Sequence, residues 1–474
     1  MLSLHRWLDE GDQNPTGTIV RASLTLRAVT SLLLVLLGSL LPSFETDAAT
    51  LSRPVAWWAR PFVRWDSVHF VNIAVEGYKT EQQAAFMPGL PAIMHGGAEA
   101  LHWLLRRPGP VQGDEVVLVG LLATTLATTT AALCLHRLTL ITFPSRPRHA
   151  LLTALLFLFA PSRPTLHGVP YTEPFAALFT FGGMLLFAQG EDTLAAATWA
   201  AGSAFRAQGA VIGAGFFGWR WILRRSFDGR KSNGEAFMRL ALNFPRFAFL
   251  ALLSASPFLA FQLYVYSLHC PSPTTGDTRP WCAQGLGLSY GWIQREYWDV
   301  GPFHYWTLLQ LPNFLLAAPV LALSLSASWS FYTRNARAAL RSTLPFLPSW
   351  LLPAPARPAA AAAEEQRPLT APGAAHLVEA LVPHVHLHTA TTLLLVVSAH
   401  VQIALRVCAT GPVVWWYAAE LVERGLARGR GRGRGRGREG SDAAAARAGR
   451  AWMRYVEVWG VVATALWAVF LPPA

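Results

Sequence analysis

Residues 23–44 read SLTLRAVTSLLLVLLGSLLPSF, and the stretch RWDSVHF follows at residues 64–70. The first stretch is an apolar run of the length that an α-helix needs to cross a bilayer. We interpret it as a retained membrane anchor that begins in the cytosol, because Arg21 and Arg27 lie at its N-terminal end and it exceeds the apolar core of a usual cleaved signal peptide. The second stretch then places Asp66 at one membrane face, beside an arginine and aromatic residues.

The composition of the whole chain is that of an integral membrane protein. Its 474 residues are 53% hydrophobic and 14% charged, with a mean hydropathy of +0.31, whereas soluble domains carry about a quarter charged residues. The net charge is +12, and much of it lies in short loops and in an arginine-glycine tract at 428–438. We interpret this charge first as loop charge that orients the spans, and only second as a surface for polyanions such as nucleic acid.

Apolar runs recur along the chain and predict about eleven transmembrane helices, some of them short. Their centres lie near residues 33, 128, 157, 180, 199, 215, 257, 317, 393, 413 and 462. When the first span starts in the cytosol, the arginine-rich loops fall on the cytosolic side, in agreement with the positive-inside rule. The stretch FRAQG at 205–209 fits either a corner between two short helices or one long helix. The expected fold is all-α, a polytopic membrane protein with interfacial helices in its lumenal loops.

The same alternation divides the chain into regions. These are a cytosolic N-terminus (1–22), a transmembrane catalytic region (23–331) with lumenal loops at 45–115, 162–173 and 267–303, a cytosolic Pro/Ala-rich loop (332–375), a second transmembrane region (376–423), an Arg-Gly-rich cytosolic insertion (424–452) and a last transmembrane helix (453–474). The two low-complexity segments bury too little apolar surface to offset their ordering entropy. We interpret the arginine-glycine tract as a solvated tether near anionic lipid, with RNA binding as the lesser alternative.

Three charged residues are candidates for chemistry, and each has a structural alternative. Asp66 fits a general base, and it equally fits the N-cap of a short helix that ends at Gly77. Glu173 fits a second acidic group in the same cavity, or the first turn of a helix opened by Pro174, where the macrodipole favours a carboxylate. Arg206 fits a phosphate ligand, because arginine offers a fork of donors, or a side chain that snorkels from a helix end.

The cysteines and histidines suggest one cross-link and no metal site. Cys270 and Cys282 flank a polar, Pro-rich loop, so a disulfide is favoured over two free thiols if that loop lies in an oxidising lumen. His384, His386 and His388 alternate, but helical geometry sets neighbouring pairs on different faces. No glycine-rich phosphate loop or hydrolase nucleophile elbow stands out, and no cofactor is predicted.

Aromatic and amide side chains crowd the segment from residue 281 to residue 319, and a further polar group follows near residue 400. Such a mixture is typical of sugar-binding surfaces, although an aromatic belt at the membrane interface gives the same composition. The candidates in these segments are Gln294, Trp298, Asp299, Asn313, His400, Gln402 and Arg406.

Taken together, these motifs resemble the PIG-V family of GPI mannosyltransferases over most of the chain. The matching blocks are Arg64–Asp66 with Gly77–Tyr78 and Phe86–Pro91, Pro170–Glu173, Phe205–Arg206 with Gly209, Pro280–Cys282, Ile293–Gln294, Tyr297–Gly301, Gln310–Ala317 with Pro319, and His400–Gln402 with Arg406. Each block alone is weak evidence for this resemblance, whereas the order of all the blocks along the chain is strong evidence. Met87–Gly89 departs from the family, which usually has another aromatic and a leucine there.

The resemblance implies a GT-C type membrane enzyme of the endoplasmic reticulum with a lumenal active site. It would transfer mannose from dolichyl-phosphate mannose to a GPI glycolipid intermediate, adding the second mannose in α1,6 linkage with inversion. Beside membrane lipids and these two substrates, the family suggests a small membrane accessory subunit in some lineages, and no nucleic acid partner. The rival functions are a lipid-linked-sugar transferase with another acceptor, and a lipid or solute transporter, which should show internal repeats that this sequence lacks.

The resemblance also implies roles for the candidate residues. Asp66 would be the catalytic base, and Glu173 a second catalytic carboxylate. Arg206 would bind the donor phosphate, with Arg406 as its reserve. The remaining candidates would bind substrate, and they are Trp65, Tyr171, Gln294, Trp298, Asp299, Asn313, His400 and Gln402.

Overall fold

The structure is a computed structural model that describes residues 2–44, 51–227, 232–270, 279–283, 288–353, 375–429, 439–469 and 471. Within these residues the chain is all-helical, without a β-strand. Five of the described helices are long and apolar enough to cross a membrane, namely α2 (Pro15–Leu40), α5 (Gly113–Thr142), α11 (Asn233–His269), α13 (Leu311–Thr343) and α14 (Ala375–Ser398). This bears out the all-α membrane fold predicted from the sequence.

The predicted number of eleven spans is not confirmed, although each predicted centre lies within a helix. The other centres fall in α6 (Pro147–Leu158), α7 (Glu173–Ala188), α8 (Asp192–Ser203), α9 (Gln208–Phe217), α16 (Pro412–Gly429) and α17 (Glu439–Ala468). At 1.5 Å per residue, the 12 residues of α6 or α8 reach about 18 Å, which is less than the roughly 30 Å of a bilayer core. Hydropathy therefore located the helices, but the shortest of them do not reach across a bilayer core.

Several helices extend into segments that the sequence assigned to loops. α13 continues to Thr343, where the loop was expected from residue 332, and α16 and α17 leave only residues 430–438 between them. Arginine is a good helix former, so Arg334 and Arg337 are compatible with this extension of α13, which is kinked at Asn335 (φ −120°, ψ 22°). Residues 354–374 of the Pro/Ala-rich segment and most of the arginine-glycine tract lie outside the described residues.

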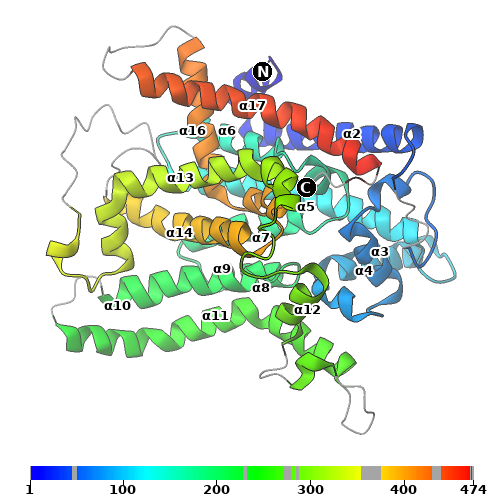
Figure 1. Cartoon of the computed structure of the whole chain (residues 1–474), viewed down its shortest axis with the longest axis horizontal. Coiled ribbons are helices and arrows are strands. Elements are labelled where there is room, and N and C mark those ends of the chain that lie inside the picture. The colour runs from blue at the N-terminus through cyan, green and yellow to red at the C-terminus, as the bar shows by residue number, and fades with distance from the viewer. Residues whose placement is uncertain are drawn as a thin grey trace.

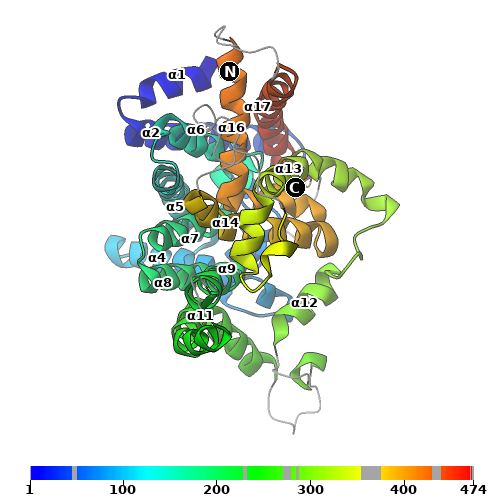
Figure 2. The ribbon, with the colours of Figure 1, turned by 90° about the vertical axis from the view of Figure 1, so that its left-hand side faces the viewer.

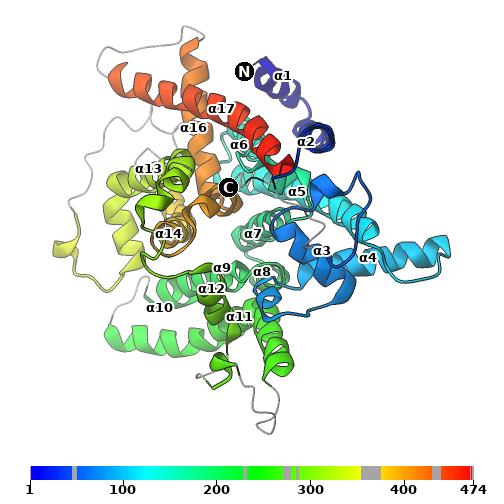
Figure 3. The same cartoon turned by 45° about the vertical axis from the view of Figure 1, so that its right-hand side comes forward.

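The long helices α11, α13 and α14 and the shorter α9 run side by side, as Figure 1 and the end-on view in Figure 2 show. One end of this group carries the short α10 (Arg225–Phe227), and the opposite end carries α12 (Ser289–Trp298). Two helices of the first large loop, α3 (Asp66–Glu76) and α4 (Gly89–Leu105), lie on the side of α12 and pack against α5 (Figure 3). The bundle therefore has two distinct ends.

The stretch at 205–209 forms a corner between two short helices, which settles the alternative left open by the sequence. α8 ends at Ser203 and α9 begins at Gln208, so Arg206 lies in the turn. The turn is tight at Gly209, where an added Cβ would lie 2.5 Å from the Ser203 backbone nitrogen and 2.6 Å from the Trp199 carbonyl oxygen. Glycine is needed here because the α8 and α9 backbones approach so closely.

Gly209→Ala should therefore destabilise the corner. The methyl group meets backbone atoms that cannot move aside without shifting α8 or α9. We therefore expect the free energy of unfolding to fall by about 1–3 kcal/mol. The matched control is Gly215→Ala in the same helix, where an added Cβ has no neighbour within 4 Å. Thermal unfolding of the detergent-solubilised protein measures both, and equal melting temperatures for the two variants would contradict the packing described.

Candidate active site

Four charged side chains from four separate parts of the chain meet at the end of the bundle that carries α3 and α12. Arg406 Nη1 donates to Asp66 Oδ2 at 3.0 Å, and Arg206 Nη1 donates to Glu173 Oε1 at 2.8 Å. Arg406 Nε also lies 3.5 Å from Glu173 Oε1, which joins the two pairs. Asp66 and Glu173 begin α3 and α7, while Arg406 lies in the short α15 (Ala404–Val407). The four residues were each singled out from the sequence.

The four side chains differ in their access to solvent. Glu173 is almost completely buried, with 3% of its side chain exposed, and Arg406 follows with 12%. Arg206 exposes 23% and Asp66 exposes 35%. Asp66 Oδ2 is held by Arg406, and Asp66 Oδ1 makes no hydrogen bond within the described part of the chain. Asp66 and Arg206 are therefore the two side chains of the four that a ligand reaches most easily.

Asp66 is not the N-cap that the sequence left as an alternative. Trp65 occupies the N-cap position with φ 53°, and no side chain caps the helix. A positive φ is rare for a residue other than glycine, and such backbone strain is found preferentially at functional sites. The helix ends at Gly77, as predicted. The Asp66 carboxylate is free of the capping role and contacts Arg406 instead.

The loop before α7 fixes the start of α3. The Asp66 backbone N–H donates to the Tyr171 hydroxyl at 3.1 Å, and the Ser67 hydroxyl donates to the Pro170 carbonyl at 2.8 Å. Tyr171 is buried, and burial together with the charge of Asp66 raises the pKa of its phenol well above the usual value. The phenol therefore stays neutral. Its ring faces the Arg406 guanidinium, whose Cζ lies 5.3 Å from the ring centre.

Glu173 is at the helix start that was its structural alternative in the sequence analysis, and its role in chemistry stays a prediction. It lies in the first turn of α7, where the helix dipole favours a carboxylate, and it contacts both arginines. Its other oxygen, Oε2, is buried without a hydrogen-bond partner in the described residues. Because a buried unpaired carboxylate oxygen is costly, the two guanidiniums are what keeps Glu173 stable in this position.

A second polar group lies between α13, α14 and α15. Tyr305 donates its hydroxyl proton to Gln402 Oε1 at 2.8 Å, and Asn313 Nδ2 donates to the Tyr305 hydroxyl at 2.8 Å. His400 contacts the Trp298 carbonyl oxygen through Nε2 at 2.6 Å and packs on the Tyr305 ring. Three predicted residues, Asn313, His400 and Gln402, are thus brought together by Tyr305, which the sequence analysis missed.

Trp298 links α12 to the charged cluster through aromatic contacts. Its ring meets Phe86 edge-on at 5.8 Å, and Phe86 stacks at 4.5 Å on His69, one turn after Asp66. Burial lowers the pKa of His69, with the Asp66 charge acting in the opposite direction. These contacts connect α12 with α3 through the first large loop.

Two predicted residues lie apart from the cluster. Asp299 is 78% exposed and pairs with His304 at 2.8 Å. Gln294 accepts a hydrogen bond through its backbone carbonyl from the Val300 N–H, and its side chain makes none within the described residues. The structure does not bring either side chain to the charged residues.

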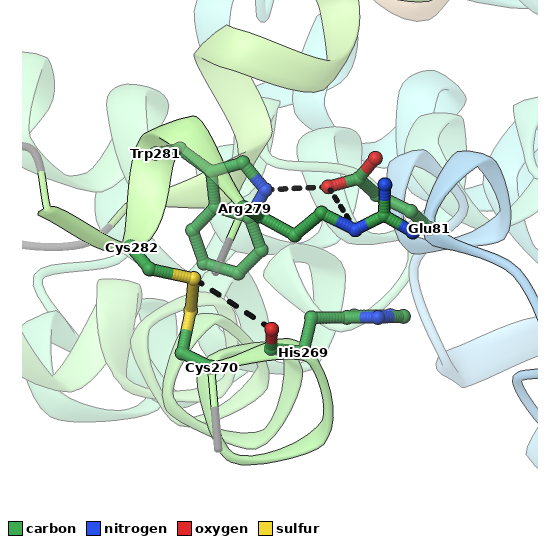
Figure 4. Close-up of a disulfide and its surroundings, with 6 residues drawn as sticks. All are labelled: Glu81, His269, Cys270, Arg279, Trp281 and Cys282. Carbon is green, nitrogen blue, oxygen red and sulfur yellow. Dashed lines mark hydrogen bonds and ion pairs between the residues drawn. A yellow bond between two sulfur atoms is a disulfide. The ribbon is translucent and has the colours of Figure 1, made fainter. Parts of the chain in front are cut away.

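Cys270 and Cys282 are joined by a disulfide, in the pairing that the sequence favours. Figure 4 shows that the neighbouring Trp281 indole points to the Glu81 carboxylate, to which its Nε1 donates at 2.6 Å. The Tyr297 hydroxyl donates to the other Glu81 oxygen at 3.0 Å. Glu81 is therefore a buried acceptor that fastens the disulfide loop and α12 to the first large loop. The sequence analysis missed it, because it lies between two of the motif blocks.

Thiol labelling tests this cross-link. Cys270 and Cys282 should resist alkylation in the denatured, unreduced protein and react after reduction, while Cys134 and Cys408, which are free thiols, react in both states. Mass spectrometry of the labelled peptides measures each site. Labelling of Cys270 and Cys282 before reduction would show that they are not joined.

Comparisons with known proteins agree on one family. The family model described as "Mannosyltransferase (PIG-V)" matches residues 18–474. GPI mannosyltransferase 2 of Cryptococcus neoformans is 32% identical over 470 residues, which cover 97% of this chain and 99% of that protein. GPI alpha-1,6-mannosyltransferase 2 of Cricetulus griseus is 30% identical, covering 85% and 84%. The human protein of that name is 28% identical, covering 67% and 69%.

Among solved structures, the oligosaccharyltransferase of Archaeoglobus fulgidus is similar with a TM-score of 0.44 and 11% sequence identity. The match covers 95% of this chain and 56% of that protein, so the chain spans little more than half its length.

Proposed function

The chain belongs to the PIG-V family of mannosyltransferases, and we propose that it adds the second mannose, in α1,6 linkage, to a GPI-anchor precursor. The proposal takes dolichyl-phosphate mannose as the donor and the lumenal face of the endoplasmic reticulum membrane as the place of reaction. The relatives named GPI alpha-1,6-mannosyltransferase 2 support the linkage. The donor, the location, the lumenal orientation and a small accessory subunit are inferred from family membership alone.

The site assignment rests on two ion pairs, Asp66–Arg406 and Glu173–Arg206. The contact between Arg406 and Glu173 joins them. An acceptor hydroxyl attacks the anomeric carbon of the donor, the bond from that carbon to the phosphate oxygen breaks, and the configuration inverts. The hydroxyl proton needs a base, and the departing phosphate needs positive charge. Dolichyl phosphate is already a stable anion and requires no general acid, so no cofactor enters the proposal.

Asp66 is the residue best placed to act as the base. Arg406 holds one of its oxygens, which orients the carboxylate, and the other oxygen is open to accept the hydroxyl proton. The Tyr171 hydroxyl fixes the backbone at this point. Glu173 is too deeply buried to share the role, so we assign it to positioning both arginines.

Arg206 is the residue best placed to meet the donor phosphate. Of the two arginines it has the more exposed side chain, and Glu173 occupies its Nη1. The fork of a guanidinium has further donors that reach phosphate oxygens while one N–H remains on a carboxylate. Arg406 is committed to Asp66 and Glu173, so we assign it to orienting the base.

Asp66→Asn should abolish mannose transfer while the protein still inserts and accumulates. Asparagine keeps the size of the side chain and accepts a hydrogen bond from Arg406, but it takes no proton. Transfer is measured with purified protein, radiolabelled dolichyl-phosphate mannose and a one-mannose GPI intermediate. The matched control is Asp114→Asn at the start of α5, which has no ion pair within the described residues. Activity of Asp66→Asn near the control's would remove the base assignment.

Arg206→Lys should lower transfer efficiency about tenfold to a hundredfold, because hydrogen bonds to charged groups contribute roughly 1.5 to 3 kcal/mol. Lysine keeps the charge but loses the guanidinium fork, whereas a snorkelling role is served equally well by lysine. The defect should appear in a titration of dolichyl-phosphate mannose and be independent of the acceptor. Arg295→Lys in α12 is the control, since Arg295 is exposed and forms no ion pair in the described residues. A wild-type donor titration for Arg206→Lys would remove the phosphate role from Arg206.

A further inference from the structure

An apolar groove of about 990 Å³ runs along the bundle between α9, α11 and α14. Its walls include Val211 and Gly215 of α9, Phe244 of α11 and Leu387 of α14, and His386 is the one ionisable side chain among the described residues that line it. The three helices are neighbours in Figure 1. Ligand pockets in proteins are usually about 300–1,000 Å³, so the groove is large enough to hold a lipid chain.

The groove meets a polar hollow at the end of the bundle that carries α10. This second hollow, of about 430 Å³, is lined by Trp219, Arg220, Arg224 and Arg225, and Trp219 also lines the apolar groove. Trp219, Arg220 and Arg224 lie on Gly218–Arg224, a π-helical segment that continues α9, and Arg225 begins α10. Such segments are rare and are frequently found at functional sites. One continuous surface therefore passes from apolar walls to arginines.

Two of the arginines at this end have no carboxylate partner in the described part of the chain. The Arg225 Cζ lies 4.2 Å from the centre of the Trp221 ring, and the Arg246 Cζ lies 5.8 Å from the same ring. Trp221 is held in place, because its Nε1 donates to Asp192 at 2.9 Å. Arg246 donates to the Thr193 hydroxyl, and neither arginine forms an ion pair among these residues.

The neighbouring arginines are neutralised by acidic residues. Arg220 pairs with Asp192, and Arg224 pairs with Glu379 at 2.6 Å. Of these four arginines, Arg220 and Arg224 are compensated by carboxylates, whereas Arg225 and Arg246 contact an aromatic ring and form no ion pair within the described residues. Arginine beside an aromatic ring retains its donors for an anion, and its fork suits phosphate oxygens.

We propose that this surface binds an anionic glycerophospholipid, with an acyl chain in the groove and the headgroup phosphate on Arg225 and Arg246. Inside a bilayer the groove alone cannot select a lipid, because all lipid tails are as apolar as its walls. The selection must come from the headgroup, and a positive pair favours a negative one. Trp219 lies 13 residues beyond Arg206, about 20 Å along a helix. The site is therefore separate from the candidate active site, and the inference does not depend on the proposed function.

Lipid retention tests the proposal without any enzymatic assay. The full-length protein is reconstituted into vesicles of phosphatidylcholine with a minor share of phosphatidylserine, extracted in mild detergent, and analysed by mass spectrometry for the lipid that stays bound. We expect phosphatidylserine to be enriched over its share in the vesicle. Arg225→Gln combined with Arg246→Gln should reduce that enrichment roughly fivefold, equivalent to about 1 kcal/mol. Arg341→Gln, an exposed arginine of α13, is the matched control and should retain it.

A second variant tests the groove and leaves its charges intact. Gly215 lines the groove, and an added Cβ there meets nothing within 4 Å, so Gly215→Leu should place its side chain in the groove. It should retain less phosphatidylserine while its melting temperature stays that of the wild type. Bound lipid in the same proportions as the vesicle, or unchanged enrichment in both variants, would overturn the proposal. The same experiment is repeated with vesicles that also contain dolichyl phosphate. If dolichyl phosphate is retained in preference to phosphatidylserine, and the double arginine variant loses that retention, the occupant is not a phospholipid.

Discussion

The cost of burying Glu173 is the constraint on which the candidate site depends. A carboxylate removed from water loses several kcal/mol of solvation, and it is stable only where cations compensate for that loss. Here the two cations come from the α8–α9 corner and from α15, and Arg406 in turn holds Asp66 at the start of α3. Four distant segments of the chain must therefore reach their positions together before Glu173 and Arg406 both have all of their partners.

This constraint explains which features the sequence could predict. Hydropathy located a helix at each predicted centre, because apolar periodicity is a local property of the chain. The corner at Arg206 was visible as an alternative, since a cation between two short apolar runs is unfavourable in a lipid-facing helix. Asp66, Glu173, Arg206 and Arg406 were all identified as candidates, but their pairing depends on contacts between residues as far apart as positions 66 and 406, and no local pattern reports such contacts.

The residues that escaped prediction share a physical reason. Glu81 and Tyr305 are positioned by partners that lie in other loops, Trp281 for the first and Gln402 for the second. Each lies in an interval between motif blocks, where no local pattern distinguished it from its neighbours. The N-cap alternative for Asp66 failed for a related reason. Residue preference favoured aspartate as a cap, but a charge-assisted contact with a buried arginine is stronger than a capping hydrogen bond at an exposed helix end.

The different roles proposed for Arg206 and Arg406 follow from the same cost of leaving a buried charge uncompensated. A cation that is deeply buried between two carboxylates cannot leave them for an incoming anion, because both carboxylates would lose their compensating charge. Arg406 is in this position. Arg206 has one carboxylate partner and a more exposed side chain. When a phosphate arrives, Arg206 can add a contact and still neutralise Glu173, so the site gains a ligand without breaking an existing ion pair. In the proposed reaction a fixed Arg406 would keep Asp66 oriented, which is what a general base requires of its neighbour.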